Sequence, residues 1–223
     1  TDRNNTRKLI NGTFDWVYEE EFGCRDGFLF NHNGDKISFW QIDANKVKDF
    51  YMINNTDSIY SFTIPVEYPK VGENLSPARI GVIDINDKKT TWMKIPGKSD
   101  EYYLPRMTWG PKNNELYIQQ LNRKQNHSKL FISNAGSGDS QLLMEEKDEA
   151  WVDVGSSWPY QAQAGWKFIN DGTEFLYTTE KDGWRHIYKF NIESKKEELI
   201  TKGEYDIIKA LSYDAKNKEI YFI

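Results

Sequence analysis

The chain of 223 residues is long enough for one sizeable core and too short for two large domains. Its net charge of -5 comes without any long basic block, so nucleic acid is excluded as an expected partner. Aromatic residues make up 15% of the chain, which favours a strand-rich fold and excludes a disordered one, and the single cysteine, Cys24, excludes an intramolecular disulfide.

The first predicted element is an acidic segment over residues 15–22, with the sequence DWVYEEEF. Its three adjacent carboxylates belong to Glu19, Glu20 and Glu21. One interpretation is a solvated acidic turn, or a first helical turn in which the helix dipole stabilises glutamate. The other is the binding of a primary ammonium, whose three donors two neighbouring carboxylates can share. Because neighbouring side chains on a helix lie about 100° apart, such convergence needs an irregular or terminal turn.

A turn followed by a short apolar strand recurs along the chain. The copies run over residues 30–39, 109–118, 168–177 and 213–222. Each begins with an aromatic residue and passes through Asn, Asp, Gly or Lys, and Asn and Gly tolerate the positive φ of a tight hairpin. The last two intervals suit a four-stranded blade of roughly 40–50 residues plus loops. The first interval is long enough to hold a large insertion.

Further strands are expected between these copies. Within the first interval, residues 68–72 predict a rigid loop, and strands follow at 79–85 and 87–92, which we interpret as one further blade. In the third unit, a hairpin turn at residues 182–183 leads into an alternating strand over 185–192. A run of such hairpins predicts an all-β fold, a β-propeller fragment built from antiparallel blades.

The acidic segment resembles the glutamate motif of the dipeptidyl peptidase IV family, which belongs to the prolyl oligopeptidase clan. Three other stretches resemble blade sequences of that family: residues 66–72 (VEYPKVG), 102–109 (YYLPRMTW) and 181–188 (KDGWRHIY). The matches extend from residue 11 to about residue 205. The glutamate motif is the specific one, and the blade sequences are moderately specific.

The resemblance implies that residues 1–223 form part of the family's N-terminal propeller domain, as about four antiparallel four-stranded blades of a larger, eight-bladed ring. It also implies that the motif projects into the active-site cavity, where two glutamates bind the free N-terminal amine of a peptide substrate. Matched by position, these residues are Glu20 and Glu21, and Glu19 is the alternative if the register shifts by one.

The resemblance extends to the whole protein. It implies a serine dipeptidyl peptidase that releases Xaa-Pro or Xaa-Ala dipeptides, with the propeller gating access to the active site. The partners it implies are the N-terminus of a peptide substrate and a C-terminal hydrolase domain expected after residue 223. Members of the family are also commonly homodimers.

The sequence departs from the family pattern. Nothing maps to the family's propeller arginine upstream of the glutamate motif, and residues 158–165 (WPYQAQAG) do not match its substrate-lining Phe and Arg. A G-x-S-x-G nucleophile elbow is missing, and the nearest strings are GSG at 136–138 and GSS at 155–157. His186, which follows them, is expected on a strand and not as a catalytic base. This segment alone is therefore not expected to hydrolyse peptides.

Metal and cofactor sites have little support. His32, His127 and His186 lie far apart without a His-x-x-x-His pair, so no metal and no cofactor is expected. Cys24 is expected to be a buried, inert thiol. Both ends of the sequence look cut, and no apolar run approaches the roughly 20 residues of a membrane span. The form of the glutamate motif and the sparse cysteine indicate a bacterial protein, for which we expect a location in the periplasm, outside the cell or at its surface.

Two alternative functions stay open. The first is a non-catalytic β-propeller module that binds protein or peptide, which a nucleophile elbow beyond residue 223 would exclude. The second is a sister peptidase of the acylaminoacyl or oligopeptidase type. Such enzymes do not need two glutamates that bind a free N-terminal amine, so the presence of the glutamate motif disfavours this alternative.

Overall fold

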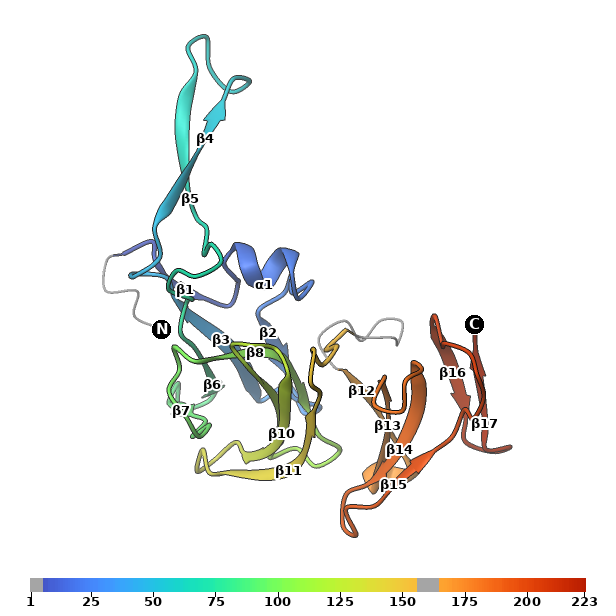
Figure 1. Cartoon of the computed structure of the whole chain (residues 1–223). Helices are drawn as coiled ribbons and strands as arrows, with labels where there is room; N and C mark the ends of the chain where they lie inside the picture. Colours follow the sequence, from blue (N-terminus) through green and yellow to red (C-terminus); the bar gives the residue numbers. More distant parts are fainter. Residues whose placement is uncertain (1–5, 156–164) are drawn as a thin grey trace.

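The computed structural model describes residues 6–155 and 165–223, and nearly all of its regular structure is antiparallel sheet (Figure 1). Three large sheets follow one another along the chain, and a two-stranded sheet comes after them. This arrangement confirms the predicted all-β fold of antiparallel blades. The first hairpin of each of these four sheets encloses one of the four predicted turns, which shows that the turn signals marked successive blades.

The first sheet is a four-stranded blade with one additional strand. Its strands pair in the order β2, β3, β6 and β7, and β1 joins β3 beyond the end of β2. The bounds are β1 (Leu9–Asn11), β2 (Phe28–Phe30), β3 (Lys36–Asp43), β6 (Ala78–Asp84) and β7 (Thr90–Trp92). A short helix, α1 (Trp16–Glu20), lies between β1 and β2 in the chain and carries the acidic segment.

The expectation of one further blade in the first interval is wrong. The strands expected at 79–85 and 87–92 are β6 and β7, which complete the first blade. Strand β6 pairs with β3 along its whole length, from Lys36 opposite Asp84 to Ile42 opposite Ala78. The chain leaves the sheet after β3, forms a separate hairpin from β4 (Asp49–Asn54) and β5 (Phe62–Glu67), and then returns. This hairpin is the large insertion that the interval allows.

The remaining sheets have simple up-and-down order. The second contains β8 (Tyr102–Trp109), β9 (Glu115–Asn122), β10 (His127–Asn134) and β11 (Ser140–Lys147). The third contains β12 (Trp166–Ile169), β13 (Glu174–Thr179), β14 (His186–Asn191) and β15 (Glu197–Leu199), with the one-turn helix η1 (Asn170–Gly172) after β12. Strands β16 (Ala210–Asp214) and β17 (Glu219–Phe222) form the last hairpin.

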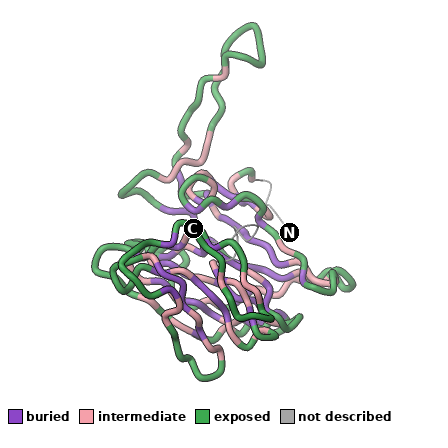
Figure 2. Tube along the Cα trace, turned by 90° about the vertical axis from the view of Figure 1, so that its right-hand side faces the viewer, coloured by how far each residue is buried: buried purple, intermediate pink, exposed green. Residues whose placement is uncertain are grey.

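The apolar cores lie between neighbouring sheets. Trp40 and Ile80 of the first sheet pack with Leu104 and Ile118 of the second. A second cluster joins the second and third sheets, and a third joins the third sheet to the last hairpin. Figure 2 shows buried positions alternating with exposed ones through the sheets, as expected for strands with one face against each neighbouring blade.

The β4–β5 hairpin projects away from the sheets, and Figure 2 shows it exposed along almost its whole length. At its base, the ring of Phe50 packs on Tyr68, and the ammonium of Lys70 lies 5.7 Å from the Phe50 ring centre. Among the residues that the structure describes, no helix has the length and apolar character needed to cross a bilayer.

Candidate functional site

Helix α1 is short because its two ends are fixed by specific backbone bonds. Asp15 is the N-cap, and its buried carboxylate accepts a hydrogen bond from the backbone N–H of Tyr18 at 3.2 Å. At the other end, Gly23 adopts a φ of +64°, and the chain turns back so that the N–H of Cys24 reaches the carbonyl of Tyr18. Glu20 is the last helical residue and Glu21 is the C-cap, so neither lies at the positive end of the helix dipole.

A β-bulge in β8 provides the docking site for α1. The pairing of β8 with β9 shifts between Tyr103 and Arg106, which frees the backbone groups of Leu104 and Pro105 from the ladder. The N–H of Leu104 donates to the Tyr18 hydroxyl at 2.9 Å, and the carbonyl of Leu104 accepts from the Trp40 indole at 2.9 Å. The second sheet therefore holds the helix through polar groups that its own ladder leaves unpaired.

The turn after α1 is held by a buried arginine. Arg106 donates to the carbonyl of Phe22 at 2.7 Å and to the carbonyl of Pro105 at 2.9 Å. The thiol of Cys24 also donates to the carbonyl of Pro105, at 3.3 Å. Burial raises the pKa of Cys24 to about 11, so the thiol is neutral, which confirms the prediction of a buried, inert cysteine. These contacts fix the backbone directly after Glu21.

Aromatic packing fixes the inner face of the helix. Tyr18 is fully buried, and its ring packs between those of Phe14 and Phe22, with Tyr103 against the same cluster. Burial raises the pKa of Tyr18 well above its ordinary value, so its hydroxyl stays protonated. With this face immobilised, the glutamates are presented outward from a rigid support.

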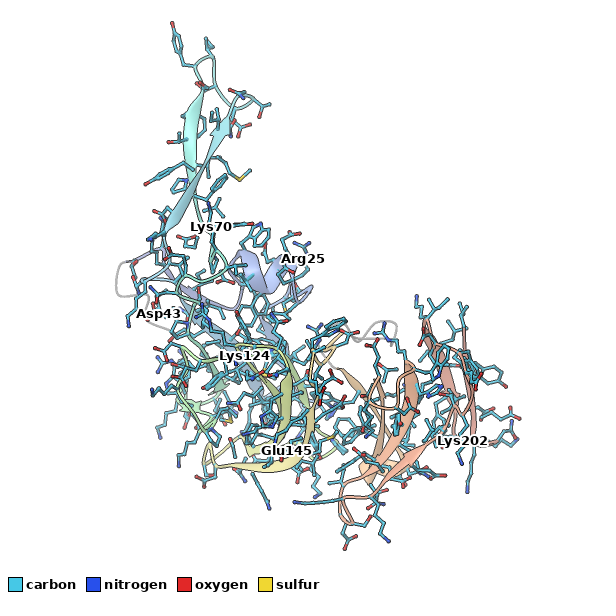
Figure 3. All side chains as sticks on the ribbon, in the orientation of Figure 1. Arg25, Asp43, Lys70, Lys124, Glu145 and Lys202 are labelled. Carbon is cyan, nitrogen blue, oxygen red and sulfur yellow. The ribbon has the colours of Figure 1, made fainter. Side chains whose placement is uncertain are left out.

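The structure brings Glu19 and Glu20 together at one cation, Arg25. Its two terminal guanidinium nitrogens lie 3.8 Å from Glu19 Oε2 and 3.8 Å from Glu20 Oε1. Figure 3 shows Arg25 beside α1, at the end of the helix. The side chains are 37% exposed for Glu19, 49% for Glu20 and 66% for Arg25, so the group faces open space. Together they form a charged cluster in which an exposed cation lies near two of the three carboxylates.

Glu21 lies on a different side of the segment. Its exposed carboxylate lines a hollow with Trp16, Tyr103, Arg123 and the loop at 68–73. Within the parts of the chain that the structure describes, Glu21 has no ion pair. The structure thus gathers Glu19 with Glu20, and the binding of one ammonium by Glu20 and Glu21 stays a prediction.

The wall of this hollow comes from the loop that follows the hairpin. The ring of Trp16 lies 4.2 Å from that of Tyr68, centre to centre. Arg123, in the turn after β9, donates to the backbone carbonyl of Glu73 and links the loop to the second sheet. The loop therefore forms a stable neighbour of Glu21.

Comparison with known proteins identifies the family. The model of the dipeptidyl peptidase IV N-terminal region matches residues 1–223. This chain belongs to that family. The structure of Porphyromonas gingivalis dipeptidyl peptidase 4 superposes with a TM-score of 0.84 at 28% identity, over 96% of this chain and 29% of that one.

The curated relatives of this dipeptidyl peptidase IV N-terminal region carry two kinds of name. The chain is 27% identical to the inactive dipeptidyl peptidase 10 of Rattus norvegicus and 25% identical to dipeptidyl peptidase 4 of Arthroderma otae. Each match covers 96% of this chain and 28% of the relative, so the chain spans less than a third of the length of either protein.

Other candidate residues of the sequence have structural roles. His186 begins β14, is buried, and has its Nδ1 atom 2.8 Å from Asp182 Oδ2, which confirms its interpretation as a strand histidine. In residues 6–155 and 165–223, no group of three or more His, Cys, Asp or Glu side chains is placed to hold a metal ion. The stretch at 158–165 lies outside the described residues except for Gly165.

Sequence reasoning missed the three arginines of the site. Arg106 contacts the acidic segment across 84 positions of the chain and Arg123 contacts its neighbouring loop across 50, so no local motif reveals them. Arg25 could have been detected more easily, because a basic residue four positions after the last of three carboxylates is a natural counter-ion for them.

Proposed function

We propose that this chain is the substrate-gating, amine-binding propeller portion of a serine dipeptidyl peptidase that releases Xaa-Pro or Xaa-Ala dipeptides. The observation that carries the proposal is the outward presentation of Glu20 and Glu21 from a helix end held by buried hydrogen bonds. Catalysis belongs to a hydrolase domain elsewhere in the protein. The proposal includes a periplasmic or cell-surface location in a bacterium, which is where an enzyme of this kind meets peptides.

The chemistry of the amine explains the two carboxylates. A peptide N-terminus carries an ammonium with three donors, and charge-assisted hydrogen bonds to carboxylates are about twice as strong as neutral ones. When the amine is bound in this way, only a short length of peptide extends from the two glutamates to the catalytic serine. The bond that is cleaved is therefore the one after the second residue. A blocked N-terminus offers no ammonium and is rejected.

Replacing either glutamate by glutamine in the full-length enzyme tests the proposal. Each of Glu20→Gln and Glu21→Gln should lower kcat/KM at least ~10-fold, because losing one charged partner of a bound ammonium costs about 1.5–3 kcal/mol. The measurement uses a Xaa-Pro aminocoumarin substrate with a free amine. Glu204→Gln, an exposed glutamate beyond the third sheet, is the matched control. Wild-type kinetics in both glutamate variants would overturn the assignment.

A non-catalytic peptide-binding module is the second candidate function. It is favoured by the likeness to a relative named as an inactive dipeptidyl peptidase. The same substrate panel separates the two functions, since a module of this kind gives no turnover in the full-length protein. Equal turnover of free and N-blocked substrates would instead indicate a peptidase of the oligopeptidase type.

We further propose that the β4–β5 hairpin pairs with the same hairpin of a second copy. Its exposed apolar residues are Phe50, Tyr51, Met52, Ile53, Ile59, Tyr60, Phe62 and Ile64. Large side chains of this kind bury about 150–250 Å² each when aromatic, so the set can cover the roughly 800 Å² per partner of a standard interface. The hairpin is a separate two-stranded sheet with unpaired backbone groups along its edges. An identical hairpin related by a twofold axis would bury its apolar side chains and pair with an edge strand.

The oligomeric state of the full-length protein tests this pairing. Wild type should be a dimer by light scattering after gel filtration, and the double variant Ile53→Asp with Tyr60→Asp should dissociate at least tenfold more readily, because two charges enter an apolar contact. Ile85→Asp, which alters an exposed apolar residue in the turn directly after β6, should keep the dimer. A monomeric wild type would overturn the proposed pairing.

A further inference from the structure

Arg25 lies across the two carboxylates of Glu19 and Glu20 with one guanidinium nitrogen toward each, at 3.8 Å in both cases. We propose that Arg25 is an internal counter-ion that competes with the peptide's ammonium for this acidic segment and thereby weakens the affinity for the amine. The inference rests on the proposed function of Glu20 and Glu21, and it adds a residue that sets substrate affinity.

The backbone position of Arg25 is fixed although its side chain is exposed. The two residues before it are held by the positive φ of Gly23 and by the bonds of Cys24 to Tyr18 and Pro105. The backbone therefore delivers residue 25 to the end of α1 in every copy of the molecule. From that anchor, a side chain that is 66% exposed can swing toward the carboxylates or away from them.

The contacts of Arg25 are those of a displaceable ion. Both distances exceed the 2.7–3.2 Å of an N–H···O hydrogen bond, so the guanidinium neutralises the carboxylates without fixing their direction. Exposed ion pairs of this kind contribute little to stability. An ammonium that forms short, charge-assisted hydrogen bonds to Glu20 displaces the guanidinium readily.

The consequence concerns the product as well as the substrate. The released dipeptide keeps the same ammonium that anchored the substrate, so a clamp that binds the amine too tightly also retains the product. A positive charge beside the clamp lowers the affinity for both, because it repels the incoming ammonium and partly neutralises the carboxylates.

Kinetics of the full-length enzyme test the role of Arg25. In Arg25→Gln, the KM for a free-amine Xaa-Pro aminocoumarin should fall about three- to tenfold, and the inhibition constant of the free Xaa-Pro dipeptide should fall by the same factor. Arg25→Lys keeps the charge and should stay within twofold of wild type for both constants. Lys202→Gln removes one positive charge from an exposed site that Figure 3 shows far from Arg25, and it should change neither constant.

The outcomes separate this inference from the function it rests on. An unchanged or increased KM in Arg25→Gln overturns the counter-ion role, and an increase would make Arg25 a residue that positions Glu20. If Glu20→Gln and Glu21→Gln lose activity in the same experiment, the amine clamp stands without the inference. If those two variants behave as wild type, the clamp itself is wrong.

Discussion

Tyr18 connects the acidic end of α1 to the second sheet. Its hydroxyl accepts the N–H of Leu104, a backbone group that the bulge of β8 removes from the strand ladder. Tyr18 is only 1% exposed, so water cannot replace the hydroxyl if it is lost. A single oxygen atom thus satisfies a buried donor of one sheet and holds the helix that presents the glutamates.

Removing that oxygen should loosen both the fold and the site. Tyr18→Phe leaves the Leu104 N–H buried without a partner, which costs about 1–3 kcal/mol of unfolding free energy. We expect denaturant unfolding of the full-length protein to show this loss, together with a several-fold decrease in kcat/KM for free-amine substrates. Tyr205→Phe, at an exposed position beyond the third sheet, is the matched control. Unchanged stability in Tyr18→Phe would contradict the anchoring role.

At the scale of elements, the hairpins could be predicted from the sequence because a few neighbouring turn residues specify each of them. The turns at 30–39, 109–118, 168–177 and 213–222 form the first hairpins of the four sheets, because Asn, Asp and Gly specify a tight reversal within a few residues. The strand expected at 185–192 is β14 within a residue at each end. Short-range signals were therefore sufficient for hairpins.

Pairing across an insertion could not be predicted in the same way. Strands β3 and β6 are neighbours in the first sheet although the β4–β5 hairpin separates them, and their own sequences do not say which partner each will take. Pro105 marks a position where β8 cannot donate to the ladder, but nothing near it in the sequence shows that α1 docks at the resulting bulge. The presence of three glutamates was evident from the sequence, but the different neighbours of Glu20 and Glu21, Arg25 for one and the hollow beside the 68–73 loop for the other, were not.

At the scale of the whole molecule, neighbouring blades also interact through buried polar groups. Glu146, on β11 of the second sheet, accepts a hydrogen bond from the hydroxyl of Thr179, on β13 of the third. Burial raises the pKa of Glu146 above its ordinary value, against the opposing effect of that hydrogen bond. Between the ordinary and the raised pKa, the folded protein binds more protons than the unfolded chain, so stability contributed by this group increases as pH falls.

Glu146→Gln should therefore stabilise the full-length protein at neutral pH. Glutamine keeps an acceptor for Thr179 and removes the charge that burial disfavours, so we expect an unfolding temperature about 1–3 °C higher at pH 7 and no difference near pH 4. Calorimetry of the wild type and the variant from pH 4 to 8 measures the difference in unfolding temperature at each pH. Glu145→Gln is a control for which the opposite result is expected, a lower unfolding temperature at pH 7. A hydrogen bond from His127 lowers the pKa of Glu145, so the ionised form of Glu145 stabilises the fold. A lower unfolding temperature for Glu146→Gln at pH 7 would refute this account.

The bulge in β8 also limits how such proteins can be recombined. Helix α1 is encoded between strands of the first sheet, yet its anchor points lie in a strand of the second. A chimera that exchanged residues 9–92 alone with a relative would transfer α1 and its glutamates without the strand of the second sheet that holds them. If the proposed function holds, the amine preference can therefore be transferred only together with both blades.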